Sequence, residues 1–411
     1  MEMPINTKLP TFMHVDLNSC FAIVEQQANS LIRNKPVAIA AYDTPGGMII
    51  ASSYEAKALG IKLGVSVSQA RQIFPGIIIL MPDPDKYFEV HKRFKDILLG
   101  YTDKVYAKSV DEFLIDFKGS LALKDKITLE EIGLDIKNKV KQVIGEYVTI
   151  NIGIATNPFN AKLAAGLHKP DGMDRIDSSN LRAIYQDLEL LDLPGINYRY
   201  QARLNLVGIY TPIDFLNASL PILRKEVFRS IVGYYWYLRL RGYPIDLVDF
   251  PRKSFGAQYA LAQKTADITE LARLLMKLSE KVGRRMRAQQ YSARGIKLFL
   301  RLADHSYFMR SQKLSYSLYS SIDIYQAAFK LLQLNINKEL VREISVSVYA
   351  LDRLINEQEN LFHDSYYNPI KIANAMDQIN DRYGEYMISS ALMANMQNVI
   401  IKRVAFGKND Q

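Results

Sequence analysis

The chain has 411 residues, of which 48% are hydrophobic and 23% charged, a composition typical of a folded protein too long for a single hydrophobic core. Its one cysteine, Cys20, excludes an internal disulfide and a cysteine-built zinc site. No apolar run approaches the ~20 residues of a membrane span, and the first residues lack the pattern of a signal peptide, so we expect a cytoplasmic protein of several domains.

The net charge of +9 is concentrated in one region of the chain. Residues 251–350 contain 17 Lys and Arg but only 7 Asp and Glu, so the rest of the chain is nearly neutral. A solvated helix face could supply part of this excess. Its concentration nevertheless favours a dedicated module that binds a polyanion over a generally basic protein.

The first part of the chain alternates short strands and helices. Apolar runs and period-two alternation predict strands, whereas a spacing of 3.6 residues predicts helices. The expected strands are 11–17, 35–42, a pair within 105–117, and 147–155, with a further apolar run at 73–85; the expected helices are 21–29, 54–61, 86–101 and 128–147. This mixture predicts an α+β domain with a largely antiparallel sheet, covered by helices on one side.

The second part of the chain contains two regions with different predicted secondary structure. Residues 181–240 are helical, with turns at 193–197 and 207–211. After Arg252 we expect a separate, small α+β domain, and then a linker, a helix and a basic end. Its strands are 254–262, 295–303 and 344–352, its helices 269–289 and 322–336, the linker is 356–365 and the last helix is 368–384.

Three acids stand inside apolar strand patterns: Asp16 in the first strand, and the adjacent Asp111 and Glu112. Most such residues are solvated surface groups, but an unpaired carboxylate in an apolar strand is costly. Phosphoryl transfer needs carboxylates that hold Mg²⁺, and two ions ~4 Å apart can align the attacking and leaving oxygens. Neighbours on a regular strand point to opposite faces, so Asp111 and Glu112 can share a site only at a turn or bulge.

Several segments, in order and suitably spaced, resemble the Y-family DNA polymerases, the lesion-bypass enzymes that include bacterial polymerase IV and the catalytic subunit of polymerase V. The resemblance covers nearly the whole chain. The segments are HVDLNSCFAIVE (14–25), SSYEAKALGIKLG (52–64), SVDEFLID (109–116), INIGIATNPFNAKLAAGLHKPDG (150–172), LPGIN (193–197), KSFGAQYAL (253–261), RYGEY (382–386) and RVAFG (403–407).

This resemblance implies an α+β fold shaped as a right hand. It comprises a ferredoxin-like palm, small fingers, a helical thumb with a helix-hairpin-helix, a separate α+β little finger, and a tail. The implied bounds are 11–19 and 83–176 for the palm, 20–82 for the fingers, 177–242 for the thumb, 252–351 for the little finger, and 352–411 for the tail.

The resemblance also implies the catalytic site. Asp16, Asp111 and Glu112 would be the catalytic carboxylates, and with the backbone carbonyl of Leu17 they would hold two Mg²⁺ ions, for which Mn²⁺ can substitute. The implied nucleotide-binding residues are Ser19, Cys20, Phe21, Tyr54, Lys57 and Lys169, with Phe21 as a steric gate that excludes the 2′-hydroxyl of an rNTP.

The chain departs from the family pattern near these residues. Lys57 stands where arginine is usual and lacks its bidentate fork. His168 replaces a residue that is usually small. Asn157–Pro158 interrupts a turn that usually contains Asn-Lys, so the match of Lys162 to a family residue is less secure.

Other segments would bind DNA and a partner protein. Gly195 and Asn197 lie in the predicted hairpin turn, where Asn197 replaces a second glycine; because asparagine tolerates positive φ, we expect the turn to survive. Candidate phosphate contacts in the basic region are Arg284, Arg285, Arg287, Arg294 and Arg310. Gln358, Leu361 and Phe362 resemble the peptide that binds the bacterial sliding clamp, although an exposed Leu-Phe pair could instead pack on its own domain.

The leading hypothesis is therefore low-fidelity, template-directed DNA synthesis across lesions. The expected partners are primer–template DNA, dNTPs and a sliding clamp, and we expect a monomer at the bacterial nucleoid, not at a membrane. One alternative is a catalytically inactive accessory protein that binds DNA or the clamp. Another is a different palm-type nucleotidyl transferase such as a cyclase, which would not need the helix-hairpin-helix or the basic module.

Overall fold

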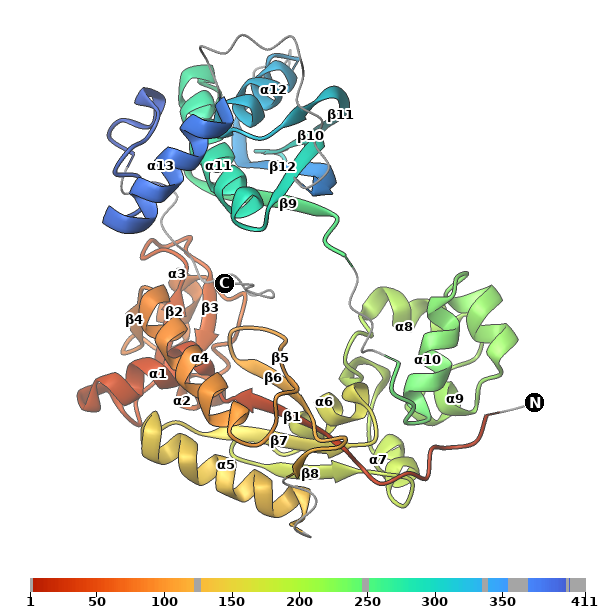
Figure 1. The fold of residues 1–411 in the computed structure, drawn as a ribbon. Helices are drawn as coiled ribbons and strands as arrows, with labels where there is room; N and C mark the ends of the chain where they lie inside the picture. Colours follow the sequence, from red (N-terminus) through yellow and green to blue (C-terminus); the bar gives the residue numbers. More distant parts are fainter. Residues whose placement is uncertain are drawn as a thin grey trace. The chain divides into compact units, whose positions relative to one another are not determined.

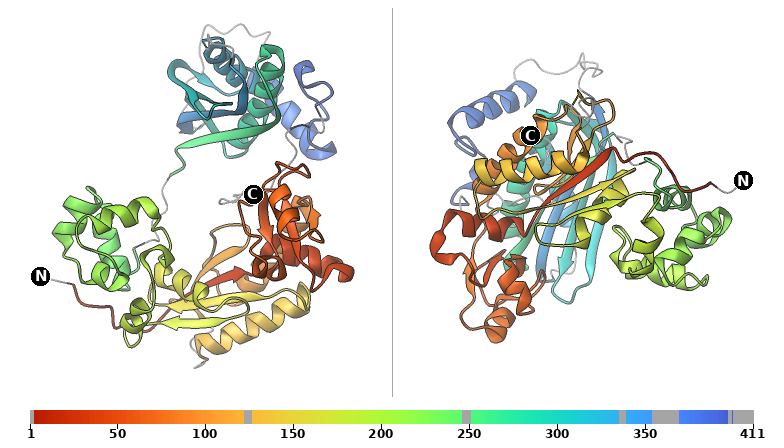
Figure 2. Two further views of the ribbon diagram at one scale, coloured as in Figure 1. Left: turned by 180° about the vertical axis from the view of Figure 1, so that it is seen from behind. Right: turned by 90° about the horizontal axis from the view of Figure 1, so that it is seen from below.

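In the computed structural model, which describes residues 3–121, 127–245, 251–334, 339–353, 369–396 and 399, the chain divides into two units at residues 248–249. Figure 1 and Figure 2 show both units. None of the helices in these ranges combines the length and the apolar composition needed to cross a membrane.

The first unit is built on a five-stranded sheet in the order β5-β6-β1-β7-β8. The central strand β1 (Phe12–Leu17) is antiparallel to β6 (Glu112–Asp116) and to β7 (Ile150–Ala155). The edge strands are β5 (Val105–Ala107), antiparallel to β6, and β8 (Met173–Ile176), parallel to β7. The predicted strands are confirmed here, and β8 is a strand that the sequence analysis did not predict.

One face of this sheet packs against α1 (Cys20–Ala28), α4 (Pro84–Leu99) and α5 (Leu129–Val143), as Figure 1 shows for α4 and α5. Local signals start two of these helices: the Asp83 side chain accepts from the Lys86 N–H before α4, and Thr128 forms a capping box with Glu131 before α5.

The opposite face of the sheet packs against α6 (Pro158–Leu167). Helices therefore cover both faces, and the prediction of a sheet covered on one side is wrong. The helix approaches closely because β7 has Gly153 beneath it: an added Cβ there would lie 2.0 Å from the Ala161 carbonyl oxygen. Burial on nearly all sides hides the helical period of α6, so the sequence analysis did not predict it.

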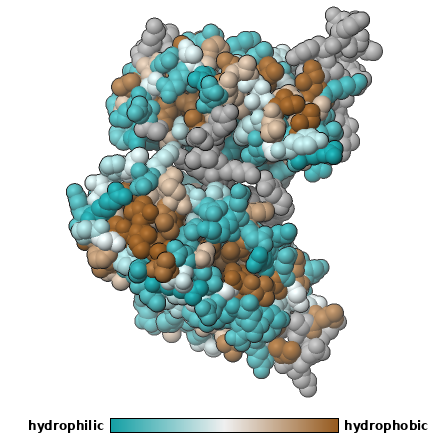
Figure 3. All heavy atoms as spheres, turned by 90° about the vertical axis from the view of Figure 1, so that its left-hand side faces the viewer, coloured by the Kyte–Doolittle hydropathy of each residue, from teal (hydrophilic) through white to brown (hydrophobic). Residues whose placement is uncertain are grey.

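A small three-stranded sheet lies between β1 and α4 in the chain. Its order is β3-β2-β4, with β2 antiparallel to β3 and parallel to β4. This sheet has its own small apolar core. On the surface, Figure 3 shows apolar side chains gathered in several separate patches. The elements are β2 (Val37–Ala40), β3 (Ile49–Ser52), β4 (Ile78–Leu80), α2 (Tyr54–Ala58), α3 (Val67–Ile73) and a 3₁₀ turn at Ser30–Ile32.

The helical part of the first unit packs around Trp236, whose ring contacts those of Phe159, Phe215 and Phe228. Its elements are α7 (Leu181–Gln186), a 3₁₀ turn (Leu190–Asp192), α8 (Tyr198–Asn205), α9 (Pro212–Asn217), a π-helix (Ile222–Val227) and α10 (Val232–Leu240). We call residues 181–240 the helical cluster.

Buried side chains bind the carbonyl oxygens at the end of α10 and so join the helical cluster to the sheet. Asn157, fully buried, donates from Nδ2 to the Arg239 oxygen at 2.8 Å. Thr156 Oγ1 and Asn6 Nδ2 both donate to the Gly242 oxygen, each at 2.9 Å. Asn157 also caps α6 by accepting from the Asn160 N–H, which explains why asparagine suits this departure from the family pattern.

The second unit contains a four-stranded antiparallel sheet in the order β11-β10-β12-β9. α11 (Ile268–Ala288) and α12 (Ser321–Gln333) pack on one of its faces. The strands are β9 (Ser254–Thr265), β10 (Tyr291–Leu302), β11 (Tyr307–Leu318) and β12 (Val341–Arg353); three were predicted, and the polar edge strand β11 was not.

A C-terminal segment adds α13 (Pro369–Tyr383) and a 3₁₀ turn at Ala391–Met393 to the second unit. Asp377 of α13 binds the guanidinium of Arg287 at 2.6 and 2.8 Å, and Tyr319 donates to Asn374 at 2.6 Å. The predicted clamp-binding residues Gln358, Leu361 and Phe362 lie outside the described residues, so that expectation stays a prediction.

Candidate active site

Strand pairing brings two of the three predicted carboxylates together. Asp16 on β1 is the direct antiparallel partner of Glu112 on β6, so both side chains stand on the same face of the sheet. On this register they share the face of His14 and Asn151, which is the side covered by α6.

Asp111 joins them because it lies in a bend directly before β6. Its carbonyl oxygen accepts from the Leu17 N–H at 2.9 Å, beside Asp16. Ser109 holds the bend: its hydroxyl donates to Asp111 Oδ1 at 2.5 Å and accepts from the Glu112 N–H at 3.1 Å. The bend supplies the irregularity that two adjacent residues need in order to face one site.

Cationic side chains contact two of these carboxylates. Lys169 donates to Asp16 Oδ2, and Lys162 on α6 donates to Glu112 Oε2 at 2.6 Å. His14 is buried with Nε2 3.6 Å from the same Glu112 oxygen, beyond hydrogen-bond distance. The sequence analysis did not predict His14 as a neighbour of the site, although its position two residues before Asp16 on one strand places both on the same face.

Burial and neighbouring charges shift the pKa values of Asp111 and Glu112 in opposite directions. Burial, together with the charges of Asp16 and Glu112, raises the pKa of Asp111 despite its hydrogen bond from Ser109. Burial alone would raise the pKa of Glu112 as well, but His14 and Lys162 lower it to about 2. Burial and then the charges of Asp111 and Asp16 raise the pKa of the Cys20 thiol well above its ordinary value.

The chemistry of the donors fits hard divalent cations. Three carboxylates beside one another supply only oxygen ligands, which suit Mg²⁺ and Mn²⁺ and not thiophilic metals. Within the described ranges no three His, Cys, Asp or Glu side chains already converge as a ligand set; the oxygens of Asp16 and Glu112 instead bind ammonium groups. A metal ion bound to these oxygens would compete with the two lysines.

The predicted nucleotide-binding residues gather at the start of α1. Ser19, at the N-cap position, adopts a left-handed backbone conformation with φ 48°. The ring of Phe21 stacks on that of Tyr87 with centroids 4.5 Å apart and is 3% exposed. Cys20 and Phe21 are the first residues of this nine-residue helix, whose N-terminus favours an anion.

Tyr54 and Lys57 of α2 stand next to this helix start. The Lys57 ammonium donates to Ser19 Oγ at 2.6 Å and lies 4.5 Å from the ring centroid of Tyr54. Burial and the neighbouring Lys169 charge lower the pKa of Lys57. The ammonium groups of Lys57 and Lys169 and the phenol of Tyr54 therefore lie near one helix N-terminus, an arrangement that suits a polyphosphate.

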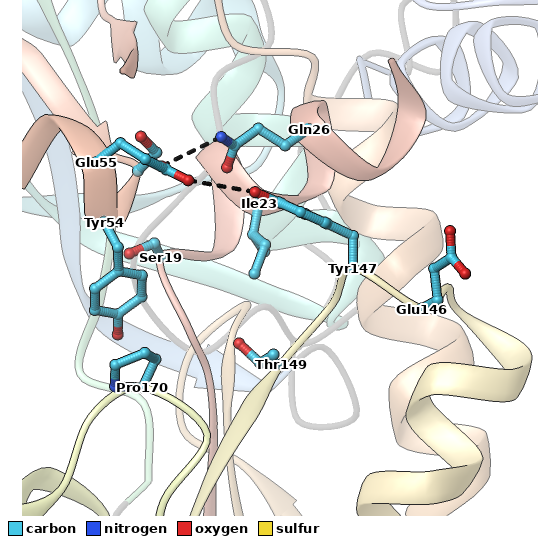
Figure 4. Close-up of a pocket in the computed structure, with 10 residues that line it drawn as sticks. Ser19, Ile23, Gln26, Tyr54, Glu55, Glu146, Tyr147, Thr149 and Pro170 are labelled. Carbon is cyan, nitrogen blue, oxygen red and sulfur yellow. Dashed lines mark hydrogen bonds between the residues drawn. The ribbon is translucent and has the colours of Figure 1, made fainter. Parts of the chain in front are cut away.

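A cavity of about 250 Å³ opens beside these residues (Figure 4). Ser19, Tyr54 and Pro170 line one side of it. Glu55, next to Tyr54, accepts from Gln26 Nε2 and from the Tyr147 hydroxyl on the opposite side, each at 3.3 Å. Sequence reasoning did not single out these last residues, because they come from three separate elements.

The hairpin turn at 193–197 is present, but one expectation about it is wrong. Gly195 has φ +95°, which only glycine adopts readily. Asn197 has φ −108° and not a positive value: it is the N-cap of α8, and its side chain accepts from the N–H groups of Arg199 and Tyr200. An N-cap needs extended backbone and a side-chain acceptor, so asparagine suits this position for a different reason.

The predicted phosphate-binding arginines occupy different environments. Arg287 is buried, binds Asp377 and donates to the Tyr319 oxygen and Ser321 Oγ, so this structure is not compatible with its expected contact to DNA. Arg284 binds Asp377 and Asp381. The other three remain candidates, each with a contact of its own: Arg285 donates to the Gly256 oxygen, Arg294 pairs with Asp352, and Arg310 stacks on Phe308.

Further cations, which are more accessible candidates for contacts to phosphate than Arg287, lie on the face of the second sheet opposite α11 and α12. Direct cross-strand pairs place Lys297 beside Ser311 and Ser347, and Arg301 beside Tyr307 and Glu343. These side chains are exposed or half-buried, whereas their neighbours Ile296, Leu298 and Leu300 point into the core. The strict alternation of GIKLFLRL could have revealed them, had the strand been assigned a face.

Comparisons with known proteins agree with this architecture. Residues 15–166 match the impB/mucB/samB family and residues 252–361 match its C-terminal domain. DNA polymerase IV of Moorella thermoacetica is 30% identical over 92% of this chain and 94% of its own, and that of Pelotomaculum thermopropionicum is 29% identical over 94% and 96%. A solved chimera of the Y-family DNA polymerases Dbh and Dpo4 superposes with a TM-score of 0.72 at 24% identity, covering 83% of this chain and 98% of that one. The chain belongs to the impB/mucB/samB family, the Y-family DNA polymerases.

Proposed function

We propose that this chain extends a primer by two-metal nucleotidyl transfer, with Asp16, Asp111 and Glu112 as the metal-binding carboxylates. Its family makes it a DNA-directed DNA polymerase of the lesion-bypass type, which acts on primer–template DNA and dNTPs and depends on divalent cations. The observation that carries the residue assignment is the register that pairs Asp16 with Glu112, with Asp111 in the adjoining bend.

Two Mg²⁺ ions, or Mn²⁺ in their place, would neutralise charge on the phosphates and lower the pKa of the attacking hydroxyl. The carboxylates of Asp16, Asp111 and Glu112 and the carbonyl oxygen of Leu17 would hold them. Ser109 fixes the direction of the Asp111 side chain, so the bend is organised before a substrate arrives.

The nucleotide would bind across the start of α1. The N–H groups of Ser19 and Cys20 would bind phosphate oxygens, with Tyr54, Lys57 and Lys169 as further donors. Phe21 would lie under the sugar, where its ring, held flat by Tyr87, leaves no room for a 2′-hydroxyl. A chain with a small three-stranded module beside this site contacts the new base pair over little area, which supports tolerance of damaged templates.

The DNA duplex would be held through phosphates and not through bases. The turn at Gly195 and the N–H groups at the start of α8 suit one backbone phosphate. Lys297 and Arg301 on the sheet of the second unit suit others, with Arg285, Arg294 and Arg310 as further candidates. A sliding clamp bound through Gln358, Leu361 and Phe362, action as a monomer, and a place at the bacterial nucleoid are also part of this proposal.

The direct test is primer extension by a variant that lacks two of the carboxylates. Asp111→Ala with Glu112→Ala should reduce extension by about 1000-fold or more, because metal ions supply several kcal/mol of transition-state stabilisation and each ~1.4 kcal/mol is tenfold in rate. DNA affinity should change little. A matched variant, Glu89→Ala, removes an exposed carboxylate of the same unit and should extend normally. Extension at the wild-type rate by the double variant would contradict the assignment, and would favour other ligands.

A further inference from the structure

Lys162, on α6, makes a shorter contact with the carboxylate of Glu112 than His14 does. Its ammonium lies 2.6 Å from Glu112 Oε2, on the face of the sheet that carries Asp16. Lys169 occupies the equivalent position at Asp16. Each of these ion pairs uses an oxygen that a divalent cation would need.

An ammonium group and a divalent cation at the same carboxylate oxygen disfavour each other. Mg²⁺ binds oxygen at ~2.0–2.1 Å, closer than the lysine nitrogen now lies, and two cations at that separation repel strongly at low dielectric. The Lys162 side chain is 45% exposed, so it can leave Glu112 without uncovering a buried surface. A metal ion at this side of Glu112 therefore competes with Lys162.

Charge balance favours coupling of this departure to nucleotide binding. Asp16, Asp111 and Glu112 carry three negative charges, and Lys57, Lys162 and Lys169 beside them carry three positive ones. Divalent cations alone would give this group of charges a net positive charge. Cations that arrive together with a triphosphate would not, because the phosphates supply compensating charge and new partners for the released ammonium groups.

We propose that Lys162 is a positioning residue that competes with a divalent cation for Glu112, and so makes metal binding depend on the incoming nucleotide. This inference rests on the proposed function, because it assumes that Glu112 is a metal ligand. It assigns Lys162 a role distinct from those of Tyr54, Lys57 and Lys169 at the triphosphate.

The test is direct binding of Mn²⁺ to the full chain, measured from the electron paramagnetic resonance signal of the free ion. Without nucleotide, Lys162→Met should bind Mn²⁺ about tenfold more tightly than the wild type, equivalent to ~1.4 kcal/mol. Lys162→Arg retains the charge and should behave like the wild type. With primer–template DNA and a non-hydrolysable dNTP analogue, the Mn²⁺ affinities of Lys162→Met and the wild type should converge.

Lys86→Met is the matched control. Lys86 pairs with Glu25 at the same 2.6 Å in the same unit, but apart from the three carboxylates, so its loss should leave Mn²⁺ affinity unchanged. Equal or weaker Mn²⁺ binding by Lys162→Met would overturn the competition. Failure of the wild type to extend primers would instead overturn the proposed function, and the two failures are thereby told apart.

Discussion

The ring of Phe21 is held between α1 and α4, and this fixed position is what a steric gate requires. Replacement by leucine keeps an apolar side chain of similar volume and so preserves packing against Tyr87. We expect Phe21→Leu to raise the incorporation of rNTPs relative to dNTPs by about 10- to 200-fold, the scale of discrimination that one steric contact supplies. Single-nucleotide insertion kinetics with both sugars measure this ratio.

Tyr87→Leu is the control for this experiment. It removes the stacking partner and the hydroxyl that donates to Glu25, but leaves the Phe21 ring itself in place. A similar rise in rNTP use in this control would mean that general loosening of the site, and not the gate, sets the choice of sugar.

At the residue scale, prediction from the sequence reached the side chains whose type alone is informative. Asp16, Asp111 and Glu112 could be selected as candidates because carboxylates are rare in apolar strands and because their segments resemble family motifs, and the required irregularity at Asp111 could be anticipated. The contact of Lys162 with Glu112 could not, because it depends on how closely α6 packs against β7. The capping role of Asn197 was also missed, since nothing in the sequence distinguishes an N-cap from a residue at positive φ within a short turn.

Among the elements, α6 depends on the absence of a side chain beneath it. A methyl group at Gly153 would lie 2.0 and 2.3 Å from backbone atoms of Ala161 and Ala165, which cannot yield without a shift of the helix. We expect Gly153→Ala to lower the free energy of unfolding by ~1–3 kcal/mol. It should also slow primer extension, because a shift of α6 would move Lys162 relative to Asp16 and Glu112 on the sheet.

Gly166→Ala is a matched substitution on the same helix. Nothing lies within 4 Å of a Cβ at Gly166, so the change should be neutral or stabilise by ~0.5–1 kcal/mol through helix propensity. Chemical denaturation of both variants gives the comparison. Equal stabilities would show that the packing of α6 against β7 tolerates an extra carbon.

The docking of α13 is a second prediction at the level of elements. Asp377 binds the buried guanidinium of Arg287, so Asp377→Ala should destabilise the docked helix by ~3–5 kcal/mol and accelerate amide hydrogen exchange across 369–383. Asp381 is largely exposed where it pairs with Arg284, and Asp381→Ala should cost at most ~1 kcal/mol. Equally slow exchange in both variants would contradict the importance of the buried pair.

Elements with a clear period could be predicted, and those without one could not. The strands β1, β7 and β10 show apolar runs or alternation, and α5 and α11 have one apolar face. The edge strand β11 is mostly polar on both faces, because the helices α11 and α12 do not cover it fully. α6 was not predicted for the opposite reason: seven of its ten residues are buried, so it has no clear polar face.

For the whole molecule, the excess of basic residues in the second unit predicts binding that salt weakens steeply. If ~6–10 phosphates are contacted, affinity for DNA should fall by ~10³–10⁵ between 50 and 200 mM salt. Lys297→Ala and Arg301→Ala should each lower the slope of log affinity against log salt by about 0.9. Fluorescence anisotropy with a labelled primer–template measures these slopes.

Lys330→Ala provides the reference for these measurements. Lys330 is exposed on α12, which covers the other face of the same sheet, so its loss should leave the slope unchanged. A slope that falls equally in all three variants would indicate that general charge, and not this face of the sheet, attracts the duplex.

Buried polar side chains hold the backbone at and just beyond the end of α10. Asn157 binds the carbonyl oxygens of Arg239 and Tyr243, and Thr156 and Asn6 bind that of Gly242, so a tilt of the helical cluster away from the sheet would leave polar groups unsatisfied in the interior. These hydrogen bonds thereby hold the distance between Asp16 on the sheet and Gly195 in the hairpin nearly constant. A phosphate gripped at that hairpin would always lie the same number of nucleotides from the growing end, and each round of synthesis would advance by slippage of the duplex and not by a pivot of the grip.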